Sequence, residues 1–243
     1  MRDRVSRPGG TLKLTTWNIH SGIGVDKRFD MGRIAAVLAE IDADVVGLQE
    51  VGWHRRRHQR VDQFAYLRDH TGYTVVESLV RDPLRTRFGN ALLTRFPVGE
   101  TRWLDLKIRG HVPRAALLAQ IETPGAAIWV AVLHLGLAVW ERERQAQRLI
   151  DAMVTDGRLP MPSVLLGDFN ILRPRSRASQ ILSGHFPTSV RLPTYPVRSP
   201  RLSLDRIYFS AEWELASARV LHDRLALHAS DHLPLIAEAR LTP

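Results

Sequence analysis

Polar residues stand at the ends of six apolar segments that are predicted to be strands, and this placement limits the fold more than any other feature. Four of these segments carry the polar residue at their C-terminal end, namely Asn18, Glu50, His134 and Asp168. Asp205 and the Asp231-His232 pair stand instead where a strand begins. If these side chains meet at one site, the strands must run in both directions.

Strands of both directions favour mixed sheets over the all-parallel sheet of a dinucleotide-binding fold. Strand and helix patterns alternate along the chain without an internal repeat. Asp30 is a suitable N-cap for a first helix. The apolar face of that helix is Met31, Ile34, Val37, Leu38 and Ile41. A second amphipathic helix is marked by Trp140, Ala146, Leu149, Ile150 and Met153. We therefore predict two mixed sheets packed face to face, with helices covering their outer faces.

The rest of the pattern completes one predicted domain over residues 11–243, after a flexible N-terminal segment at residues 1–10. Further strands are predicted near residues 73–77, 90–95, 98–108, 114–121, 127–133, 205–209, 213–221 and 233–241. Residues 171–203 are rich in Pro, Arg and Ser, and we predict a long functional loop there with one short helix near residues 179–182. No linker divides the chain into two domains.

The composition narrows the class of protein. The chain has 243 residues, no cysteine and a formal net charge of +9, carried almost entirely by arginine. The lack of cysteine excludes disulfides, thiolate metal sites and a cysteine nucleophile. No apolar run precedes the first strand or approaches the roughly 20 residues of a membrane span, so we expect a soluble, cytoplasmic protein. The positive charge favours polyanionic partners, although a solvated arginine-rich surface explains it equally well. Charge alone does not tell whether such a partner is nucleic acid or an anionic lipid surface.

The carboxylates and amides among these residues are groups that bind a hard metal ion and a phosphate. Glu50 leaves a buried run at a strand end, where it could hold a divalent ion or serve as an ordinary surface or capping residue. Asn18 could lie at the same metal site, or it could simply occupy a turn. In GDFN, Asp168 and Asn170 alternate on an extended segment, so they could together position an attacking water and a phosphoryl oxygen. An Asx turn that closes the strand is the alternative.

Two histidines add positive charge and a proton donor. His134 follows a buried strand and would, on its own, be a structural residue. Together with His232 it could flank a phosphate and neutralise charge that develops on the phosphate oxygens. Asp205 could fix the tautomer and orientation of such a histidine. On a regular strand Asp231 and His232 point to opposite faces, so one could ligate a metal while the other approaches substrate; a hydrogen-bonded strand start is the alternative.

Taken in order, these segments resemble the endonuclease/exonuclease/phosphatase superfamily. The matching segments are TTWNIHSG, LQEV, GNALLTRFPV, the His134-Leu135 step, GDFN, LDRIYFS and SDHLPL, and they extend over about residues 12–241. The segment HLGLAVWERERQAQRL resembles small bacterial members. The superfamily includes deoxyribonucleases, abasic-site endonucleases, sphingomyelinases and inositol-polyphosphate phosphatases. The resemblance implies a four-layered α/β/β/α sandwich.

The resemblance also implies catalytic roles for the matched residues. Asp168 would orient or deprotonate the attacking water, and Asn170 would hold a phosphate oxygen. His232, oriented by Asp205, would contact the scissile phosphate. His134 would be a second phosphate-facing histidine.

A second group of residues is implied to bind metal and phosphate. Glu50 would be the principal Mg²⁺ ligand, with Asn18 beside it, Asp231 in the metal region and Mn²⁺ as a substitute ion. Arg114 resembles a phosphate-contacting arginine, and an ordinary surface residue is the alternative. Glu77 is a candidate for orienting His134.

The implied reaction is hydrolysis of a phosphodiester by in-line attack of water. His134 makes the site more similar to the deoxyribonuclease and sphingomyelinase branches than to abasic-site enzymes. We predict nuclease-type activity on nucleic acid, with a phosphodiesterase or phosphatase acting on a phospholipid or small headgroup as the alternative, and a non-catalytic basic module as a third class. Two basic segments, residues 54–60 and 81–87, could contact a polyanion or close over a terminal phosphate.

Overall fold

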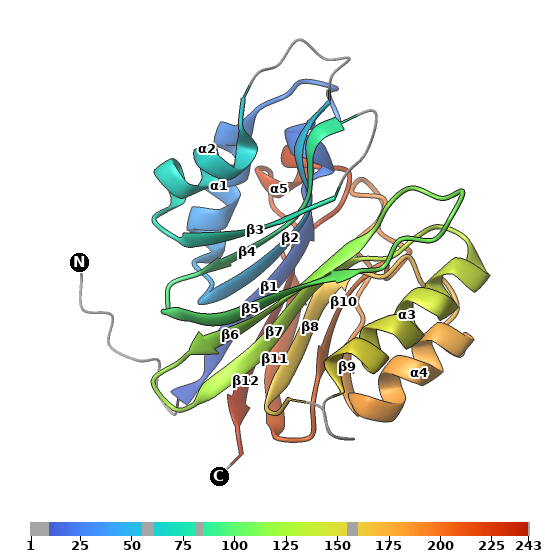
Figure 1. Ribbon diagram of the computed structural model, residues 1–243. Helices are drawn as coiled ribbons and strands as arrows, with labels where there is room; N and C mark the ends of the chain where they lie inside the picture. The colour runs from blue at the N-terminus through green and yellow to red at the C-terminus, as the bar shows by residue number, and fades with distance from the viewer. Residues whose placement is uncertain (1–9, 55–60, 81–84, 155–159, 243) are drawn as a thin grey trace.

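Two six-stranded sheets packed face to face form the centre of the molecule, and helices cover both outer faces (Figure 1). The computed structural model describes residues 10–54, 61–80, 85–154 and 160–242. Most of both basic segments (residues 55–60 and 81–84) and residues 1–9 of the predicted N-terminal segment therefore lie outside the described residues. Within the described ranges, no helix is long and apolar enough to cross a membrane.

The first sheet has the strand order β11-β12-β1-β2-β4-β3. Its strands are β1 (Leu12–Asn18), β2 (Val45–His54), β3 (Thr74–Leu79), β4 (Arg85–Thr94), β11 (Trp213–Val220) and β12 (Leu235–Leu241). The second sheet has the order β5-β6-β7-β8-β10-β9. Its strands are β5 (Val98–Asp105), β6 (Ala115–Glu122), β7 (Ala127–His134), β8 (Ser163–Asp168), β9 (Thr188–Val190) and β10 (Asp205–Phe209). The pairs β1-β2 and β7-β8 are parallel and the other pairs antiparallel, which confirms the prediction of mixed sheets.

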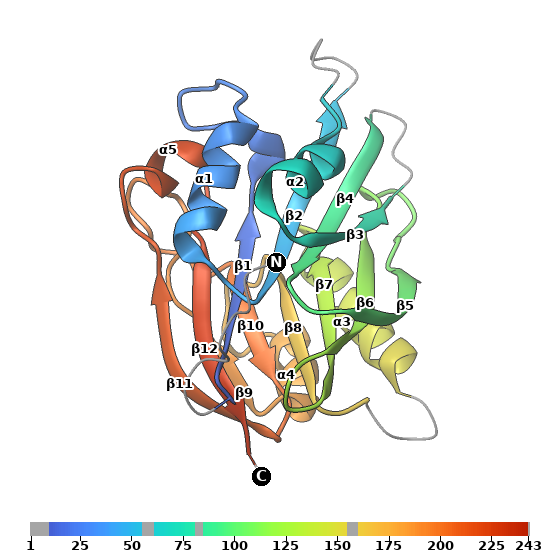
Figure 2. The same cartoon turned by 90° about the vertical axis from the view of Figure 1, so that its left-hand side faces the viewer.

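The helices form the two outer layers. The first sheet is covered by α1 (Met31–Ile41), α2 (Gln63–Thr71) and the short α5 (Ala226–Ala229), as Figure 2 shows from that side. The second sheet is covered by α3 (Val139–Met153) and α4 (Arg177–His185). A 3-10 turn, η2 (His20–Gly22), follows β1. The Asp30 side chain accepts a hydrogen bond from the Arg33 amide and so caps α1 as predicted.

Three apolar layers lie between these four layers, which explains why the central strands are apolar on both faces. In β8, Val164 and Leu166 pack between the two sheets, while Leu165 packs toward α3 and α4. A further layer joins α1 and α2 to the first sheet. The predicted four-layered α/β/β/α sandwich is therefore confirmed.

Two local predictions are wrong. Trp140 is predicted on the apolar face of the second helix, but it stands in the first turn of α3 and is 45% exposed. The short helix predicted near residues 179–182 is present within α4, but the rest of residues 171–203 is not all loop, because it also contains the strand β9. The sequence pattern does not predict α2, since only Phe64 and Leu67 provide its buried apolar side chains.

Candidate active site

The predicted polar residues meet at one end of the two sheets. In the second sheet, Asp168 at the end of β8 lies opposite His134 on one side and Asp205, the first residue of β10, on the other. The Asn18 amide, at the end of β1, crosses from the first sheet to the second. The convergence of strand ends with a strand start is the arrangement that the sequence predicted.

Asn18 bridges the carboxylates of the two sheets. Its Nδ2 donates to Oε1 of Glu50 and to Oδ2 of Asp168, both at 3.1 Å. Its Oδ1 accepts from the backbone N–H of His20 at 3.0 Å. The side chain is 2% exposed, so its orientation is fixed by these three hydrogen bonds rather than by water.

Glu50 reaches the site through a distortion of its strand. The sequence predicts Glu50 at the end of a strand, but β2 continues to His54. The pairing of β2 with β4 shifts register between Gln49 and Val51, and Glu50 between them has a φ of +60°. A bulge of this kind re-aims a side chain relative to its neighbours. The half-buried Glu50 carboxylate is thereby turned toward Asn18.

Asp168 and Asn170 do not alternate on an extended segment, and this prediction is wrong. Asn170 lies beyond β8 with a φ of +52°, and its N–H donates to Oδ1 of Asp168 at 3.0 Å. The alternative Asx turn is therefore present. It nevertheless brings the Asn170 amide nitrogen to 3.2 Å from Nε2 of His134 and 3.0 Å from the Leu135 carbonyl oxygen, to which it donates.

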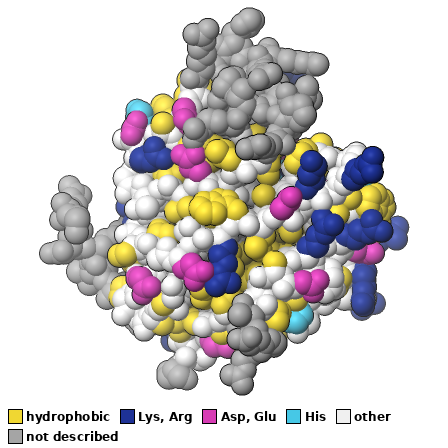
Figure 3. Space-filling model, viewed as in Figure 1, with side chains coloured by type: hydrophobic (Ala, Val, Ile, Leu, Met, Phe, Trp, Pro, Cys, Tyr) yellow, Lys and Arg dark blue, Asp and Glu magenta, His cyan; other side chains and the backbone are white. Residues whose placement is uncertain are grey.

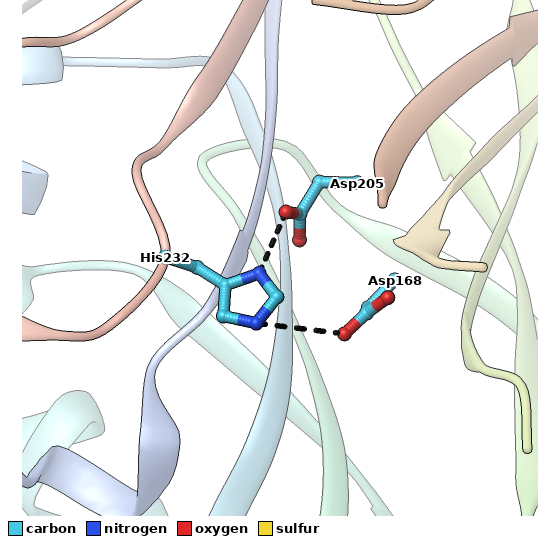
Figure 4. A group of neighbouring side chains, drawn as sticks. All are labelled: Asp168, Asp205 and His232. Carbon is cyan, nitrogen blue, oxygen red and sulfur yellow. Dashed lines mark hydrogen bonds and ion pairs between the residues drawn. The ribbon is translucent and has the colours of Figure 1, made fainter. Parts of the chain in front are cut away.

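His232 is held by a buried carboxylate (Figure 4). Its Nδ1 lies 2.8 Å from Oδ2 of Asp205, which also accepts from Thr194 Oγ1 at 2.5 Å. Its Nε2 points toward Oδ2 of Asp168, 3.9 Å away. Oδ2 of Asp168 also lies 3.5 Å from Nε2 of His134, so two imidazoles face one carboxylate oxygen.

The segment that carries Asp231 and His232 is a loop and not the predicted regular strand start, because β12 begins only at Leu235. Hydrogen bonds attach this loop to β1: Ser230 Oγ donates to the Asn18 carbonyl oxygen, and Trp17 Nε1 donates to that of His232. The Asp231 side chain is 36% exposed and lies 3.7 Å from Nδ1 of His20.

Three residues of the site were not predicted. Thr194 binds Asp205, the Tyr195 ring lies 4.7 Å from the His232 ring, and His20 approaches Asp231. His20 belongs to the TTWNIHSG segment and could have been selected from it. Thr194 and Tyr195 stand in the Pro-rich segment, where no spacing distinguishes them from other loop residues.

Burial and mutual charge move two pKa values in the site. Burial alone would lower the pKa of His232, but the carboxylates of Asp205, Asp168 and Asp231 outweigh it and raise the pKa to about 10. Burial, together with the charge of Asp205, raises the pKa of Asp168 to about 6, against the opposing effects of His232 and the Asn18 and Asn170 hydrogen bonds. At neutral pH the site therefore contains an imidazolium beside a weakly basic carboxylate.

The donor set suits a hard divalent cation. Asp168, Asp205 and His232 offer ligand atoms that all lie within 4.8 Å of one another. In His232, Asp205 holds Nδ1, while Nε2 faces Asp168. The remaining groups are carboxylate and amide oxygens, which Mg²⁺ and Mn²⁺ prefer. The half-buried Glu50 carboxylate could also hold such an ion.

Arg114 and Glu77 belong to different sheets. Arg114 is 9% exposed and directly precedes β6, whose first residues pair with the end of β7 near His134. Glu77 lies on the edge strand β3, where Oε1 accepts from Arg68 at 3.0 Å. The roles of Arg114 toward phosphate and of Glu77 toward His134 stay predictions.

Comparison with known proteins agrees with the fold. A family model described as Endonuclease/Exonuclease/phosphatase family matches residues 15–232. The Escherichia coli (strain K12) protein YbhP is 31% identical over 252 residues, which cover 95% of this chain and 97% of YbhP. Among solved structures, the human Nocturnin catalytic domain with bound sulfate has 21% identity and a TM-score of 0.73, over 96% of this chain and 94% of that one. The mannosyl-6-phosphatase Bt3783 of Bacteroides thetaiotaomicron VPI-5482 has 19% identity and a TM-score of 0.74, over 94% and 99%.

Proposed function

The chain belongs to the endonuclease/exonuclease/phosphatase family, and we propose that it is a divalent-metal-dependent phosphodiesterase. In this proposal it hydrolyses its substrate by in-line attack of water on the phosphorus. One observation carries the proposal. A buried carboxylate oxygen, Oδ2 of Asp168, accepts from Asn18 Nδ2 and faces the Nε2 atoms of His134 and His232 at 3.5 and 3.9 Å. A base beside two imidazoles can supply the proton transfer and the charge neutralisation that hydrolysis of a phosphoester needs.

Asp168 is the proposed general base. Its pKa of about 6 leaves it ionised at neutral pH while making it more basic than an exposed aspartate. The Asx turn fixes Oδ1 and leaves Oδ2 at the centre of the site, where a water between the carboxylate and the phosphorus can be oriented.

His232 is the proposed proton donor to the phosphate. Asp205 keeps the ring protonated and directs Nε2 toward the site, so a proton is available for a phosphoryl oxygen. His134 and the Asn170 amide, 3.2 Å apart, would contact a second oxygen, and Arg114 a third. These groups would stabilise the charge that spreads over the phosphoryl oxygens in the transition state.

Glu50, with Asn18 and Asp231, would hold the metal ion. When bound, a divalent ion supplies neutralisation of negative charge on the phosphoryl and leaving oxygens. Asn18 connects Glu50 to Asp168 and would therefore hold the ion site at a fixed position relative to the base.

Two substrate classes follow from different features of the molecule. The net charge of +9 supports nuclease-type activity on nucleic acid. The apolar side chains around the site support the alternative, a phosphodiester at a lipid surface.

The test is hydrolysis of a generic phosphodiester with Mg²⁺, Mn²⁺ or EDTA, followed by plasmid, single-stranded oligonucleotide, phospholipid and phosphomonoester substrates. Glu50→Gln and Asp168→Asn should each lose metal-dependent turnover. Glu122→Gln is the matched control, because Glu122 is exposed at the end of β6 remote from His134. Normal turnover by Glu50→Gln or Asp168→Asn would overturn the proposal.

A further inference from the structure

Three loops of the second sheet each combine a predicted phosphate-facing residue with an exposed apolar side chain. The pairs are Arg114 with Val112, His134 with Leu137, and Asn170 with Leu172. The apolar members are 51%, 74% and 59% exposed, in that order. Val139 and Trp140, 58% and 45% exposed, continue the row onto the first turn of α3. We call these five side chains (Val112, Leu137, Val139, Trp140 and Leu172) the apolar rim.

The clustering is what makes the apolar rim informative. Exposed apolar residues that stand singly are normal on protein surfaces, whereas a contiguous group beside a site marks an interaction surface. Eleven large apolar side chains are exposed among the described residues, and five of them belong to the rim. The Asn170 amide donates to the Leu135 carbonyl oxygen, which ties the loop of Leu172 to that of Leu137.

Buried polar side chains of α3 hold the rim in place. Arg142 Nη1 donates to the carbonyl oxygens of Gly136, at 3.3 Å, and Leu137. Oε2 of Glu141 accepts from the Ala138 amide and lies 3.2 Å from Nδ1 of His111, next to Val112. The apolar tips are therefore presented on a fixed framework and do not need to be ordered when a partner binds.

Basic side chains border the apolar rim. The segments that carry the rim side chains, and α3, also carry exposed basic residues: Lys107, Arg109, Arg144, Arg148, Arg173 and Arg175. Figure 3 shows hydrophobic side chains with Lys and Arg beside them, and Asp and Glu among these, on the side where α3 lies in Figure 1. Apolar tips surrounded by cations match the interface of an anionic bilayer, where apolar groups enter the headgroup boundary and cations meet the lipid phosphates.

Nucleic acid fits the rim less well. Bases bind exposed sequence-tolerant sites by stacking on aromatic faces. Four of the five rim side chains are aliphatic. The fifth, Trp140, already has the Arg144 guanidinium 5.1 Å above its ring and the edge-on His111 ring 4.7 Å away.

We infer that the apolar rim and its basic border dock this protein onto an anionic phospholipid surface. The inference deepens the proposed function, on which it rests for its consequence that the cleaved phosphodiester is presented at that surface. His134, Asn170 and Arg114 would then face the lipid phosphates, because each lies two or three residues from a rim side chain.

The test is flotation of the full chain with phosphatidylcholine vesicles that contain or lack phosphatidylglycerol. The wild type should bind the anionic vesicles preferentially and bind less in high salt. Leu137→Ser/Val139→Ser should reduce vesicle affinity roughly tenfold or more, since two exposed aliphatic side chains are removed from the contact. Met161→Ser is the matched control, because Met161 is 44% exposed and precedes the start of β8, at the far end from Asp168. Thermal unfolding of each variant checks that the fold is retained.

Two further measurements separate docking from hydrolysis. Asp168→Asn should bind anionic vesicles like the wild type even though it no longer cleaves a phosphodiester. Loss of hydrolysis can therefore be distinguished from loss of membrane binding. Arg144→Gln/Arg148→Gln should weaken binding to anionic vesicles more than to neutral ones. Equal binding by wild type and Leu137→Ser/Val139→Ser, or no vesicle binding by wild type, would overturn the inference. Loss of oligonucleotide binding in Leu137→Ser/Val139→Ser with vesicle binding unchanged would also overturn it and assign the rim to nucleic acid.

Discussion

At the scale of single residues, Asp205 Oδ2 serves two donors at once, Thr194 and His232. Asp205→Asn would remove the charge that keeps His232 protonated and oriented. We expect kcat to fall about 10- to 100-fold, the usual effect of losing a partner that orients a functional histidine, with little change in KM. Steady-state kinetics on a soluble phosphodiester measure both constants. Asp151→Asn, at an exposed position near the end of α3, is the control and should behave like wild type.

Thr194→Val tests the second donor. The valine keeps the volume but removes the hydroxyl that lies 2.5 Å from Asp205, so the carboxylate stays charged and becomes less firmly placed. We expect kcat to fall by about tenfold, which corresponds to about 1.4 kcal/mol. The decrease should be smaller than for Asp205→Asn, because the carboxylate keeps its charge and its contact with His232. Thr194→Ser should recover most of the loss. A Thr194→Val enzyme slower than Asp205→Asn would contradict this ranking.

The residue types of the site could be predicted from the sequence, but the local backbone that aims them could not. Asn18, His134 and Asp205 needed only a strand end or start, which apolar patterns reveal. Glu50 depends on a bulge, and Asn170 on a left-handed turn. Bulges and single left-handed residues leave little trace in a hydrophobic pattern, so their side-chain directions were not predictable.

At the scale of elements, helices and strands could be predicted where burial imposes a periodic spacing on their apolar residues. The helix after Asp30 and the strand SVLLGD were predicted correctly because their apolar residues follow the core on one or both faces. α2 has the sequence QFAYLRDHT and buries few apolar side chains, so it gave no periodic signal. Trp140 matched the helical spacing but lies beyond the edge of the core, where α3 reaches the rim of the site.

The contact between β2 and the second sheet gives a prediction about packing. A Cβ added at Gly47 would lie 2.7 Å from Cβ of Leu166 and 3.2 Å from Cγ1 of Val132, so the two sheets approach closely where glycine stands. Gly47→Ala should destabilise the protein by about 1–3 kcal/mol, the usual cost of overpacking a core. Urea unfolding measures the loss. Gly125→Ala is the control, because no atom lies within 4 Å of its added Cβ, and an equal effect of both variants would exclude overpacking as the cause.

At the scale of the whole molecule, the site exists only because two sheets meet. Asn18 and Glu50 come from the first sheet, whereas His134, Asp168 and Asp205 come from the second. Asn18 accordingly joins the two carboxylates, because it donates to Glu50 within its own sheet and to Asp168 of the other sheet. Anything that binds the joined carboxylates should therefore stabilise the entire fold.

Metal binding offers a test of this link. An ion at ten times its Kd adds about 1.4 kcal/mol to the stability of the folded state. For a protein of this size that corresponds to a rise in Tm of roughly 3–6 °C. We expect Mg²⁺ or Mn²⁺ to raise the Tm of the wild type and of Glu122→Gln, but not that of Glu50→Gln. A full shift in Glu50→Gln would place the ion elsewhere.

The raised pKa of His232 should make the stability of the whole fold depend on pH. The ring has an ordinary pKa of 6.5 in the unfolded chain and about 10 in the folded protein, so the folded state holds an extra proton between these values. Its stabilising contribution is complete below pH 6.5 and is lost as the pH rises through about 10. A tenfold difference in proton affinity between the folded and unfolded states corresponds to about 1.4 kcal/mol, so the total loss of stability should be on the order of a few kcal/mol.

Urea unfolding of the wild type and of His232→Asn at intervals between pH 6 and 10.5 would isolate this effect. The other titrating groups are common to both proteins, so the difference in unfolding free energy reports His232 together with its effect on the pKa of Asp168. The advantage of the wild type should shrink steadily with rising pH and be smallest at the alkaline end. The pKa of Asp168 is about 6 with His232 present and should rise when the His232 charge is removed, so the alkaline part of the range reports His232 most directly. A difference that is constant with pH would mean that Asp205 orients a neutral ring, and the proton proposed for the phosphate would then have to come from another group.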